Sequence, residues 1–554
     1  MPATRASRAN GVEKAATTDP TLSSRYGDWK EAFANPADGS LGTDDIPQAA
    51  ENLRKAFDTE KTISRDWRIG QLKACARMLS EGADELCAAM QADLHRSPFE
   101  GFVIELNLVN AEIQQAIGML DKWMAPKYTE LSALNIPCWS RTVCEPYGVV
   151  LVLGPWNYPV QITMAPLVAA IAAGNCVMVK PGSFAQHTSH ALSRLIQRYL
   201  DPECIKVAEG DKDVTTALLE ERWDKIAFTG SAYVGRIVAQ AAAKHLTPCL
   251  LELGGKSPCI VDKSCHLEHT AQRLVWGAFL NAGQTCVRPD FLLVDALVAD
   301  ALLAKIKQAI VDFYGSDTAA TPYFGRMINA KAFARLRAIL DDAPSHVRRI
   351  GGSYDEGALY IEPTILDYGT DEKGFCASAA MQDEIFGPIL PVLRYEGGVE
   401  TALRLARQCS HGKPLAFYCY ARDGDVKDQI CRRTTSGGLC LNDNLMHLAN
   451  RDLPFGGVGA SGMGAYHGAR SFLAFSHEKA VLEKSPLLDE SFLLKPLLAA
   501  RFPPYTPVKK FLLKAFSLRL ADHLVNAHRR PVVWLALILL VAWRVLGLRI
   551  TWDA

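Results

Sequence analysis

The chain begins with a helical pattern and changes near Tyr147 to short apolar runs separated by helical segments. Between Pro47 and about Leu120, alanine- and leucine-rich segments repeat their apolar positions with the period of an amphipathic helix. From residue 148 the first short run, GVVLVL, is closed by Gly154-Pro155. Runs of this length that are bounded by turn residues predict buried strands.

Five such runs form the first alternating region. A helical segment through Met164 and Ile171 follows the first run and ends at Gly174-Asn175, a helix-terminating pair. The alternation predicts a doubly wound parallel sheet, which binds ligands at the carboxyl ends of its strands. A second α/β region is expected from about 254 to 444. The later runs of the first region are Cys176 to Val179, Ile205 to Ala208, Lys225 to Phe228 and Pro248 to Leu251.

Length and composition describe an ordinary globular protein of several domains. A chain of 554 residues is too long for one hydrophobic core, so two or three domains are expected. Its 60 basic and 60 acidic residues cancel, which argues against a nucleic-acid partner. The fifteen cysteines form no Cys-x-x-Cys pair. No metal site is therefore expected, and free thiols in a reducing compartment are the simplest interpretation.

The two ends of the chain differ in character. The first 45 residues lack an apolar signal segment, and their composition favours a disordered tail while leaving an organelle-targeting segment open. At the other end, Val532 to Trp543 is an unbroken apolar run, about 18 Å as a helix against a hydrocarbon core of about 30 Å. Residues 509–530 before it carry six Lys/Arg and one acid. This pattern favours membrane attachment, as an anchor or an interfacial helix, over packing against the protein or a partner subunit.

Three separated segments carry candidate chemistry. Cys286 follows a short Gly-Gln-Thr turn, Glu252 ends a strand before two glycines, and Asn157 follows another strand within Gly-Pro-Trp-Asn. A thiolate can attack a carbonyl carbon, an amide can stabilise the resulting oxyanion, and a carboxylate can activate water against a thioester. Each residue alone is more commonly a core thiol, a solvated strand end or a turn residue.

The combined motifs resemble those of the aldehyde dehydrogenase superfamily, in particular the class 3 and fatty aldehyde dehydrogenase branch. Glu252-Leu-Gly-Gly-Lys precedes Gly-Gln-Thr-Cys286 by thirty-four positions, which is a specific combination. The resemblance covers about residues 46 to 505. Further matching stretches are GRMIN at 325–329, Pro363-Thr364, EIFGP at 384–388, Asn442-Asp443, Met446-His447 and LPFGGVGASGMGAYHG at 453–468.

The resemblance implies a role for each matching residue. Cys286 attacks the aldehyde, Asn157 and the Cys286 amide hold the oxyanion, and Glu252 activates the water that cleaves the thioester. Lys180 binds the adenosine ribose, Glu384 binds the nicotinamide ribose, and Phe386 lies beside the nicotinamide ring. The implied cofactor-binding residues are Trp156, Lys180, Ser183, Gly230, Ser231, Gly235, Leu253, Glu384 and Phe386.

The cofactor preference is open because one position departs from the family pattern. Ser183 stands in Lys180-Pro-Gly-Ser where many members have Lys-Pro-x-Glu, whose glutamate repels the 2′-phosphate of NADP. Without this like-charge penalty we expect NADP to be accepted alongside NAD. A second departure, Ala460 in place of asparagine, has no physical explanation.

The resemblance also implies an architecture and partners. We expect an α/β fold with a doubly wound cofactor domain, an α/β catalytic domain and a small bridging element that forms a homodimer. The expected substrate is a medium- to long-chain aliphatic aldehyde, met at the cytosolic face of the endoplasmic reticulum. A CoA-acylating enzyme and a non-catalytic membrane scaffold are the alternatives. The expected ranges are 1–45 for the tail, 46–253 for the cofactor domain with bridging residues 128–147, 254–479 for the catalytic domain, 480–508 for the second bridging segment and 509–554 for the membrane-associating tail.

Overall fold

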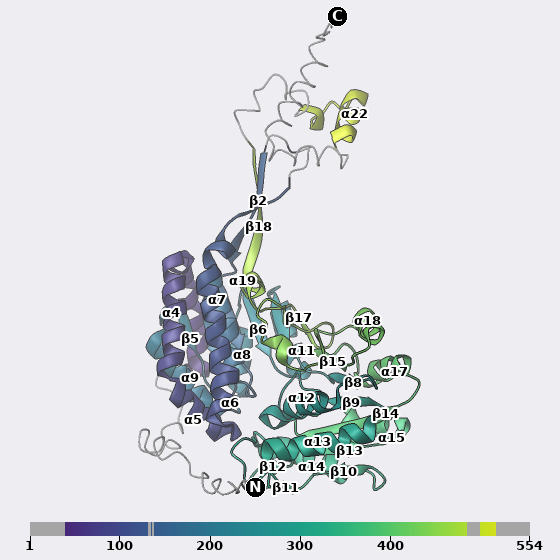
Figure 1. The fold of residues 1–554 in the computed structure, drawn as a ribbon. Coiled ribbons are helices and arrows are strands. Elements are labelled where there is room, and N and C mark those ends of the chain that lie inside the picture. Colours follow the sequence, from purple (N-terminus) through teal and green to yellow (C-terminus); the bar gives the residue numbers. More distant parts are fainter. Residues whose placement is uncertain (1–38, 131–134, 136–137, 485–498, 517–554) are drawn as a thin grey trace, which may run out of the picture. The chain divides into compact units, whose positions relative to one another are not determined.

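The computed structural model describes residues 39–130, 135, 138–484 and 499–516 (Figure 1). The chain divides into two compact units, one of residues 1–120 and 146–476 and one of residues 121–145 and 477–554. The predicted α/β class is confirmed, because two parallel sheets, each covered by helices, make up the first unit. All fifteen cysteines lie within the described residues, and all are free thiols.

The first sheet is the predicted doubly wound one. Its six strands are arranged in the order β17-β7-β6-β3-β4-β5, and the five from β7 to β5 are parallel. Strand order reverses between β3 and β6, which is where such sheets bind dinucleotides. The strands are β3 (Val149–Leu153), β4 (Cys176–Lys180), β5 (Ile205–Val207), β6 (Lys225–Thr229), β7 (Cys249–Glu252) and β17 (Gly462–Met463).

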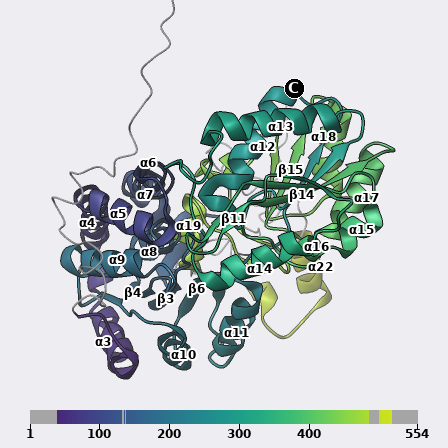
Figure 2. The ribbon, with the colours of Figure 1, turned by 90° about the horizontal axis from the view of Figure 1, so that it is seen from below.

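Burial on both faces explains the continuous apolar runs of this sheet. Every residue of β3 and β4 is buried, as expected for parallel strands covered by helices on two sides. Helix α8 (Gln161–Ala173) is buried at every position from 162 onward and ends at Gly174, whose φ of 91° suits glycine. The helices α4 (Arg65–Glu81), α5 (Ala83–Leu94) and α9 (Gln186–Tyr199) gather beside it (Figure 2).

The second sheet has seven strands in the order β10-β13-β14-β9-β8-β15-β16, all parallel except β10. Alternate residues of β8 face opposite cores, since Cys259 and Val261 pack with α12 and α13 while Ile260 packs with α14 and α17. Figure 2 shows α12 and α13 across the sheet from α14. The strands are β8 (Pro258–Val261), β9 (Phe291–Asp295), β10 (Arg348–Ile350), β13 (Thr364–Asp367), β14 (Ile389–Tyr395), β15 (Ala416–Tyr420) and β16 (Gly438–Leu441).

The remaining elements of the first unit connect these layers. Most are short, and one of them, η3, is a π-helix. They are η1 (Thr43–Asp45), α3 (Ile46–Asp58), η2 (Lys61–Ile63), α6 (Pro98–Glu100), η3 (Gly101–Leu106), α7 (Asn107–Met124), α10 (Lys212–Glu220), α11 (Ala232–Ala243), α12 (Leu267–Phe279), η5 (Leu280–Gly283), α13 (Ala299–Tyr314), α14 (Ala330–Asp341), β11 (Tyr354–Asp355), β12 (Tyr360–Ile361), α15 (Glu372–Ala377), α16 (Ala379–Gln382), α17 (Val399–Cys409), α18 (Gly424–Arg433), η6 (Met446–Leu448) and α19 (Ala469–Ala474).

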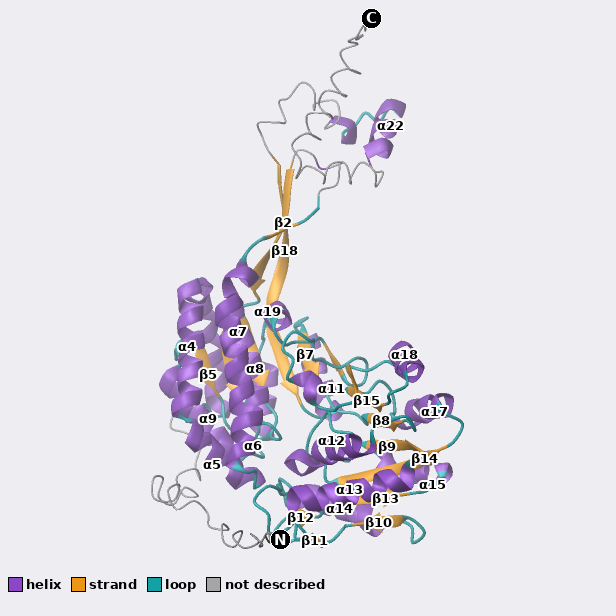
Figure 3. Ribbon diagram, viewed as in Figure 1, coloured by secondary structure: helices purple, strands orange, loops and turns teal. Residues whose placement is uncertain are grey.

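The second unit contains a three-stranded sheet of order β1-β2-β18 (Figure 3). The strands are β1 (Lys127–Tyr128), β2 (Cys138–Pro146) and β18 (Ser476–Lys484), and most residues of β18 are exposed. An ion pair of 2.9 Å joins Arg141 to Glu483 across β2 and β18. A 3₁₀ turn, η7 (Ala499–Arg501), and α22 (Pro507–Phe516) complete the unit.

Two predicted boundaries are wrong in detail. Residues 39–45 were assigned to the tail, yet the Leu41 N–H donates to the Val207 carbonyl at 3.1 Å and η1 forms directly after it. Gly462 and Met463 were assigned to the catalytic domain, but as β17 they pair antiparallel with β7 in the first sheet. Only glycine fits at 462, because a Cβ there would lie 2.2 Å from the Leu251 carbonyl oxygen.

The predicted membrane segment falls largely beyond the part of the chain that the structure describes. Residues 532–543 lie outside the described residues. Within the described ranges no helix combines the length and the apolar content needed to cross a bilayer.

Candidate active site

A strained loop between α12 and β9 presents Cys286. Asn281, Ala282 and Gly283 all have left-handed φ values, of 53°, 51° and 74°. At Gly283 a Cβ would lie 2.3 Å from the Gly387 carbonyl oxygen, so only glycine fits. Left-handed conformations at non-glycine residues are uncommon and cluster at functional sites. The loop places Cys286 at the wall of a cavity.

Cys286 is half-buried among opposing electrostatic influences. Burial raises the pKa of its thiol, and the nearby negative charges of Glu384 and Glu252 raise it further. The backbone N–H groups of Cys286 and Val287 point at the sulfur and lower this pKa. Both carboxylates therefore lie close enough to the thiol to act on its charge.

Asn157 lies directly against the loop that bears the thiol. It is 4% exposed, and its Nδ2 donates to the carbonyl oxygen of Gln284 at 3.1 Å. The residues that follow Asn157 and Gln284 are also hydrogen-bonded to each other, since the hydroxyls of Tyr158 and Thr285 are 2.6 Å apart. An amide has two N–H groups, and this bond uses one. This bond fixes the amide against the loop that bears Cys286.

Glu252 ends β7 and is 3% exposed. Burial raises the pKa of its carboxyl well above the usual range, while the backbone of Gly457 acts in the opposite direction. The contact with the Gly457 backbone N–H is weak, because among the described residues neither carboxylate oxygen has a hydrogen bond of ordinary geometry. Buried polar groups are normally hydrogen-bonded. A buried carboxyl without such bonds is better explained by a role in chemistry than by a role in stabilising the fold.

The cavity that Cys286 lines has a volume of about 220 Å³ and lies within the first unit. Its polar groups are few and include Glu112, Gln161, Arg451 and His467. Such a lining suits an apolar molecule with one reactive end. The aliphatic and aromatic lining residues are Val103, Ile104, Leu108, Tyr158, Ile162, Trp276, Leu280, Val287, Leu445, Met446, Leu448, Ala449, Phe455 and Tyr466.

Lys180 and Ser183 lie at the carboxyl end of β4. Lys180 is buried and its Nζ donates to the Pro181 carbonyl oxygen at 3.1 Å. Burial lowers the pKa of its ammonium to about 8, although the charges of Asp211 and Glu209 oppose this effect. Ser183 is half-buried in the turn before α9. A buried cation at this edge of the sheet suits a polar ligand.

The turn from β6 into α11 has the form of a phosphate-binding helix start. Ser231 is the N-cap of α11, and its side chain accepts from the Val234 N–H. A Cβ at Gly230 would lie 2.6 Å from the Phe228 ring, and one at Gly235 would lie 2.6 Å from Leu253 Cδ2. Both glycines allow close packing at the N-terminus of the helix, where backbone N–H groups favour anions.

Glu384 and Phe386 come from the loop between α16 and β14. A Cβ at Gly254 would lie 2.0 Å from a Glu384 carboxylate oxygen, so this carboxyl lies directly over the glycine. Burial and the charge of Asp290 raise the pKa of Glu384 to about 8. The Phe386 ring meets the Trp156 ring edge-on, with centroids 5.4 Å apart. Together with Lys180 and the start of α11, these groups fit a dinucleotide.

Comparison with known proteins identifies the family. Residues 32–481 match the aldehyde dehydrogenase family. The chain belongs to this family. Aldehyde dehydrogenase family 3 member B3 of Mus musculus is 41% identical over 474 residues, covering 85% of this chain and 95% of the relative. The structure described as the substrate-bound state of Staphylococcus aureus AldH has a TM-score of 0.80 and 38% identity, covering 85% of this chain and 99% of that one.

The chain is thus an NAD(P)-dependent aldehyde dehydrogenase, as its motifs indicated. A Rattus norvegicus relative, named aldehyde dehydrogenase, dimeric NADP-preferring, is 40% identical over 465 residues, which are 84% of this chain and 98% of that one. The non-catalytic scaffold considered from the sequence is not supported.

The structure links Asn157 and Glu252 to Cys286, although neither lines the cavity that Cys286 lines. Asn157 bonds to the loop of Cys286, and the charge of Glu252 acts on the thiol. The roles predicted for these residues and for the nine cofactor-binding positions remain predictions. The sequence did not point to Gln284, whose Nε2 donates to the Arg326 carbonyl at 2.9 Å and whose Oε1 accepts from the Ile328 N–H at 3.0 Å. Its place inside the GQTC motif was the available signal.

Proposed function

We propose that this aldehyde dehydrogenase oxidises medium- to long-chain aliphatic aldehydes to carboxylates. The observation that supports this substrate class is the apolar cavity that includes Cys286 in its wall. An aliphatic chain that fills such a cavity leaves water, while its carbonyl end reaches the thiol. A membrane-associated enzyme would meet aldehydes of this kind at the bilayer surface.

The first step is attack of the Cys286 sulfur on the carbonyl carbon, which forms a C–S bond and an oxyanion. Burial raises the pKa of the thiol, so its proton passes to a solvent water as the C–S bond forms and the carbonyl π electrons move onto the oxygen. The Asn157 amide, which is fixed to the Gln284 carbonyl, and the backbone N–H of Cys286 donate to the oxyanion in this proposal. Each such donor typically contributes about 10²–10³ in rate.

The second step is hydrolysis of the thioester on Cys286. The nicotinamide cofactor, when bound, supplies the hydride acceptor that turns the adduct into this thioester. Glu252 then takes a proton from water as the oxygen attacks the carbonyl carbon and the sulfur leaves. Its raised pKa makes its carboxylate a stronger base than an exposed glutamate.

A series of straight-chain aldehydes from hexanal to hexadecanal tests the substrate class. We expect kcat/KM to rise about fourfold per methylene until the cavity is filled, because each buried CH₂ contributes about 0.8 kcal/mol. Cys286→Ser is the control and should abolish NAD(P)H formation with every substrate. A flat profile, or a preference for benzaldehyde over decanal, would contradict the proposal.

Water, and not coenzyme A, is the proposed acceptor of the acyl group. The buried carboxyl of Glu252, which no hydrogen bond of ordinary geometry holds among the described residues, supports hydrolysis. With decanal and both acceptors present, the product should be free decanoic acid. Accumulation of decanoyl-CoA would instead support the acylating alternative.

We propose further that the enzyme accepts NADP alongside NAD. Ser183, the position that departs from the family pattern, lies in the turn directly after Lys180, and its side chain brings no negative charge. The rat relative that carries the name NADP-preferring is consistent with such acceptance. Values of kcat/KM for both cofactors within about tenfold of each other are expected.

A homodimer is proposed through the β1-β2-β18 sheet. Strand β18 forms an edge of this sheet and exposes most of its residues. An unpaired edge is a ready site for another chain, and the rat relative is named dimeric. Sedimentation equilibrium should give twice the chain mass. Lys479→Pro, within β18, should convert the dimer to a monomer.

Membrane attachment is proposed through the chain after Val508, at the cytosolic face of the endoplasmic reticulum. The described start of this segment, α22, exposes Val508 by 67% and Phe511 by 71%. It also carries Lys509, Lys510 and Lys514, a composition suited to an anionic bilayer surface. Removal of all residues after Val508 should release the enzyme into the soluble fraction. Retention on membranes would overturn the assignment.

A further inference from the structure

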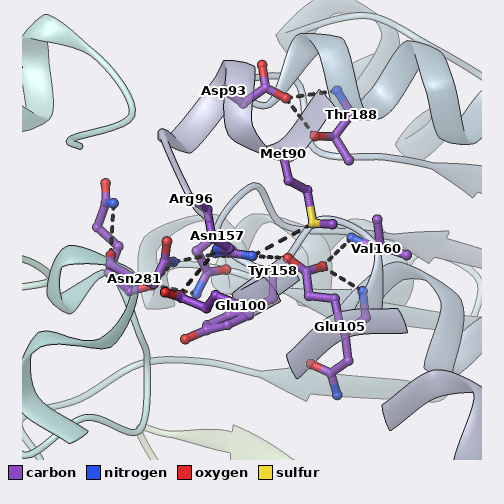
Figure 4. Close-up of polar contacts among 12 residues, drawn as sticks. Met90, Asp93, Arg96, Glu100, Glu105, Asn157, Tyr158, Val160, Thr188 and Asn281 are labelled. Atoms are coloured by element: carbon purple, nitrogen blue, oxygen red, sulfur yellow. Dashed lines mark hydrogen bonds and ion pairs between the residues drawn. The ribbon is translucent and has the colours of Figure 1, made fainter. Parts of the chain in front are cut away.

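One fully buried arginine lies behind the amide that is proposed to hold the oxyanion. Arg96 follows α5 and is 1% exposed. Its guanidinium pairs with Glu105, lies 3.5 Å from a Glu100 carboxylate oxygen, and stacks 4.8 Å from the centre of the Tyr158 ring. Figure 4 shows these side chains converging on one another. A charge buried this deeply needs partners in fixed positions.

The same guanidinium holds the backbone of Asn157. An Arg96 terminal nitrogen donates to the Asn157 carbonyl oxygen at 2.6 Å. That oxygen also accepts from Asn281 Nδ2 at 2.9 Å, and the same Asn281 nitrogen lies 3.2 Å from the Gln284 carbonyl oxygen. One carbonyl thus joins the Asn157 segment both to Arg96 and to the loop of Cys286 (Figure 4).

Glu105 fixes the other end of the segment. One of its carboxylate oxygens pairs with Arg96, and the other accepts from the N–H groups of Val160 and Gln161 at 2.7 and 2.9 Å. These N–H groups belong to the start of α8. Glu105 lies in the π-helix η3, a form that is rare and frequent at functional sites. Asn157 is therefore held from both sides by one buried ion pair.

We propose that Arg96 is a positioning residue for the oxyanion-binding amide of Asn157. The inference rests on the roles proposed above for Asn157 and Cys286. A buried ion pair adds little net stability, and apolar replacements of both partners are often neutral. The Arg96–Glu105 pair instead fixes the position of Asn157. A displacement of about 1 Å at a catalytic group can cost about 10²-fold in rate.

The variants Arg96→Met and Arg96→Met/Glu105→Gln test this role together. The single variant leaves Glu105 buried without its partner and should lose thermal stability. The double variant removes that charge, while the glutamine oxygen still accepts from the start of α8, so stability should return. We expect the first-order rate of NAD(P)H formation in a single turnover of decanal to stay about 10²-fold below wild type in both, with KM for the cofactor unchanged.

Arg68→Met is the matched control. Arg68 is another buried arginine, 4% exposed, whose side chain donates to the carbonyls of Thr62 and Ala172 at 3.1 and 3.2 Å. This variant should lose stability and keep its single-turnover rate. Arg96→Lys keeps the charge but not the planar fork, and its rate should lie between wild type and Arg96→Met.

Three results would overturn the inference. The first is recovery of the rate together with stability in the double variant. The second is an equal loss of rate in Arg68→Met, and the third is a wild-type rate in Arg96→Met. A different pattern marks failure of the proposed function itself. In that case wild type forms no NAD(P)H from decanal, or Cys286→Ser retains the wild-type rate.

Discussion

Asn157 bonds to the loop of Cys286 and the charge of Glu252 acts on its thiol, yet the structure holds these two groups in opposite ways. Asn157 bonds through its side chain to Gln284 and through its carbonyl to two further side chains. Glu252 is equally buried, but among the described residues its carboxylate has no hydrogen bond of ordinary geometry, and the backbone of Gly457 is the one group whose weaker hydrogen bond lowers its pKa. A donor that stabilises developing charge works best when it is already in place, whereas a base must reach a water molecule. The contrast indicates one fixed group and one poised group.

The largest expected effect comes from removing the poised group. Glu252→Gln keeps the shape of the side chain and removes its basicity, so turnover should fall by about 10²–10⁴. Attack and hydride transfer do not need this base, so one equivalent of NAD(P)H per site should still form in a rapid burst. Stopped-flow absorbance resolves the burst from turnover. Loss of the burst along with turnover would contradict the assignment to hydrolysis.

The Glu252→Gln variant should also change how the thermal stability of the enzyme depends on pH. Because burial raises the pKa of Glu252 in the folded state, its carboxyl favours the folded state below its unfolded pKa, and this contribution is lost as pH rises through the folded pKa. Glutamine has no such loss. The melting temperature of Glu252→Gln relative to wild type should therefore rise with pH. An equal difference at all pH values would mean that the carboxyl has the same pKa in the folded and unfolded states, so that burial does not raise it.

Removing the fixed group should have the next largest effect. Asn157→Ala deletes an oxyanion donor and should lower the rate of the burst itself by about 10²–10³. Asn175→Ala is the control, since Asn175 is also buried and its amide donates to the Ala170 and Phe475 carbonyls at 3.1 and 3.0 Å. The control should lose stability and keep its burst rate. Equal burst rates in the two variants would remove the distinction between them.

The sequence predicted the chemical groups of this contrast but not the support behind them. Cys286, Glu252 and Asn157 lie in motifs that mark the family, and apolar runs closed by glycines located the strands that carry them. Arg96 and Glu105 sit in an ordinary helical stretch, nine residues apart, and only the π-helix and the fold bring them behind Asn157. Likewise, Gly462 returns to the first sheet from a segment more than 200 residues beyond β7. Contacts between residues so far apart in the sequence leave no periodic pattern of apolar and polar positions from which they could be predicted.

The two residues expected near the adenosine ribose, Lys180 and Ser183, also differ in how firmly they are held. Lys180 is buried and bonded to the Pro181 carbonyl, while Ser183 is a half-buried turn residue. Ser183→Glu should lower kcat/KM for NADP about tenfold and leave that for NAD unchanged, because a carboxylate repels the 2′-phosphate. Ser183→Gln has the same size without the charge and should leave the ratio of the two cofactors near that of wild type. A ratio unmoved by Ser183→Glu would show that the side chain points away.

The smallest expected effect concerns the other carboxyl beside the thiol. After burial, the charge of Glu384 is the leading influence that raises the pKa of Cys286. Glu384→Gln should therefore increase the thiolate fraction and speed alkylation of Cys286 by iodoacetamide severalfold without cofactor, as quantified by mass spectrometry. Because burial raises the pKa of Glu384 to about 8, the difference should appear above that pH and vanish below it. Asp383→Asn changes the adjacent exposed carboxyl, which acts on Glu384 and not on the thiol, and should leave the alkylation rate at pH 9 close to that of wild type. Equal alkylation of Glu384→Gln and wild type at pH 9 would mean that the charge of Glu384 does not act on the thiol, which would leave burial, Glu252 and the backbone N–H groups of Cys286 and Val287 as the influences on its pKa.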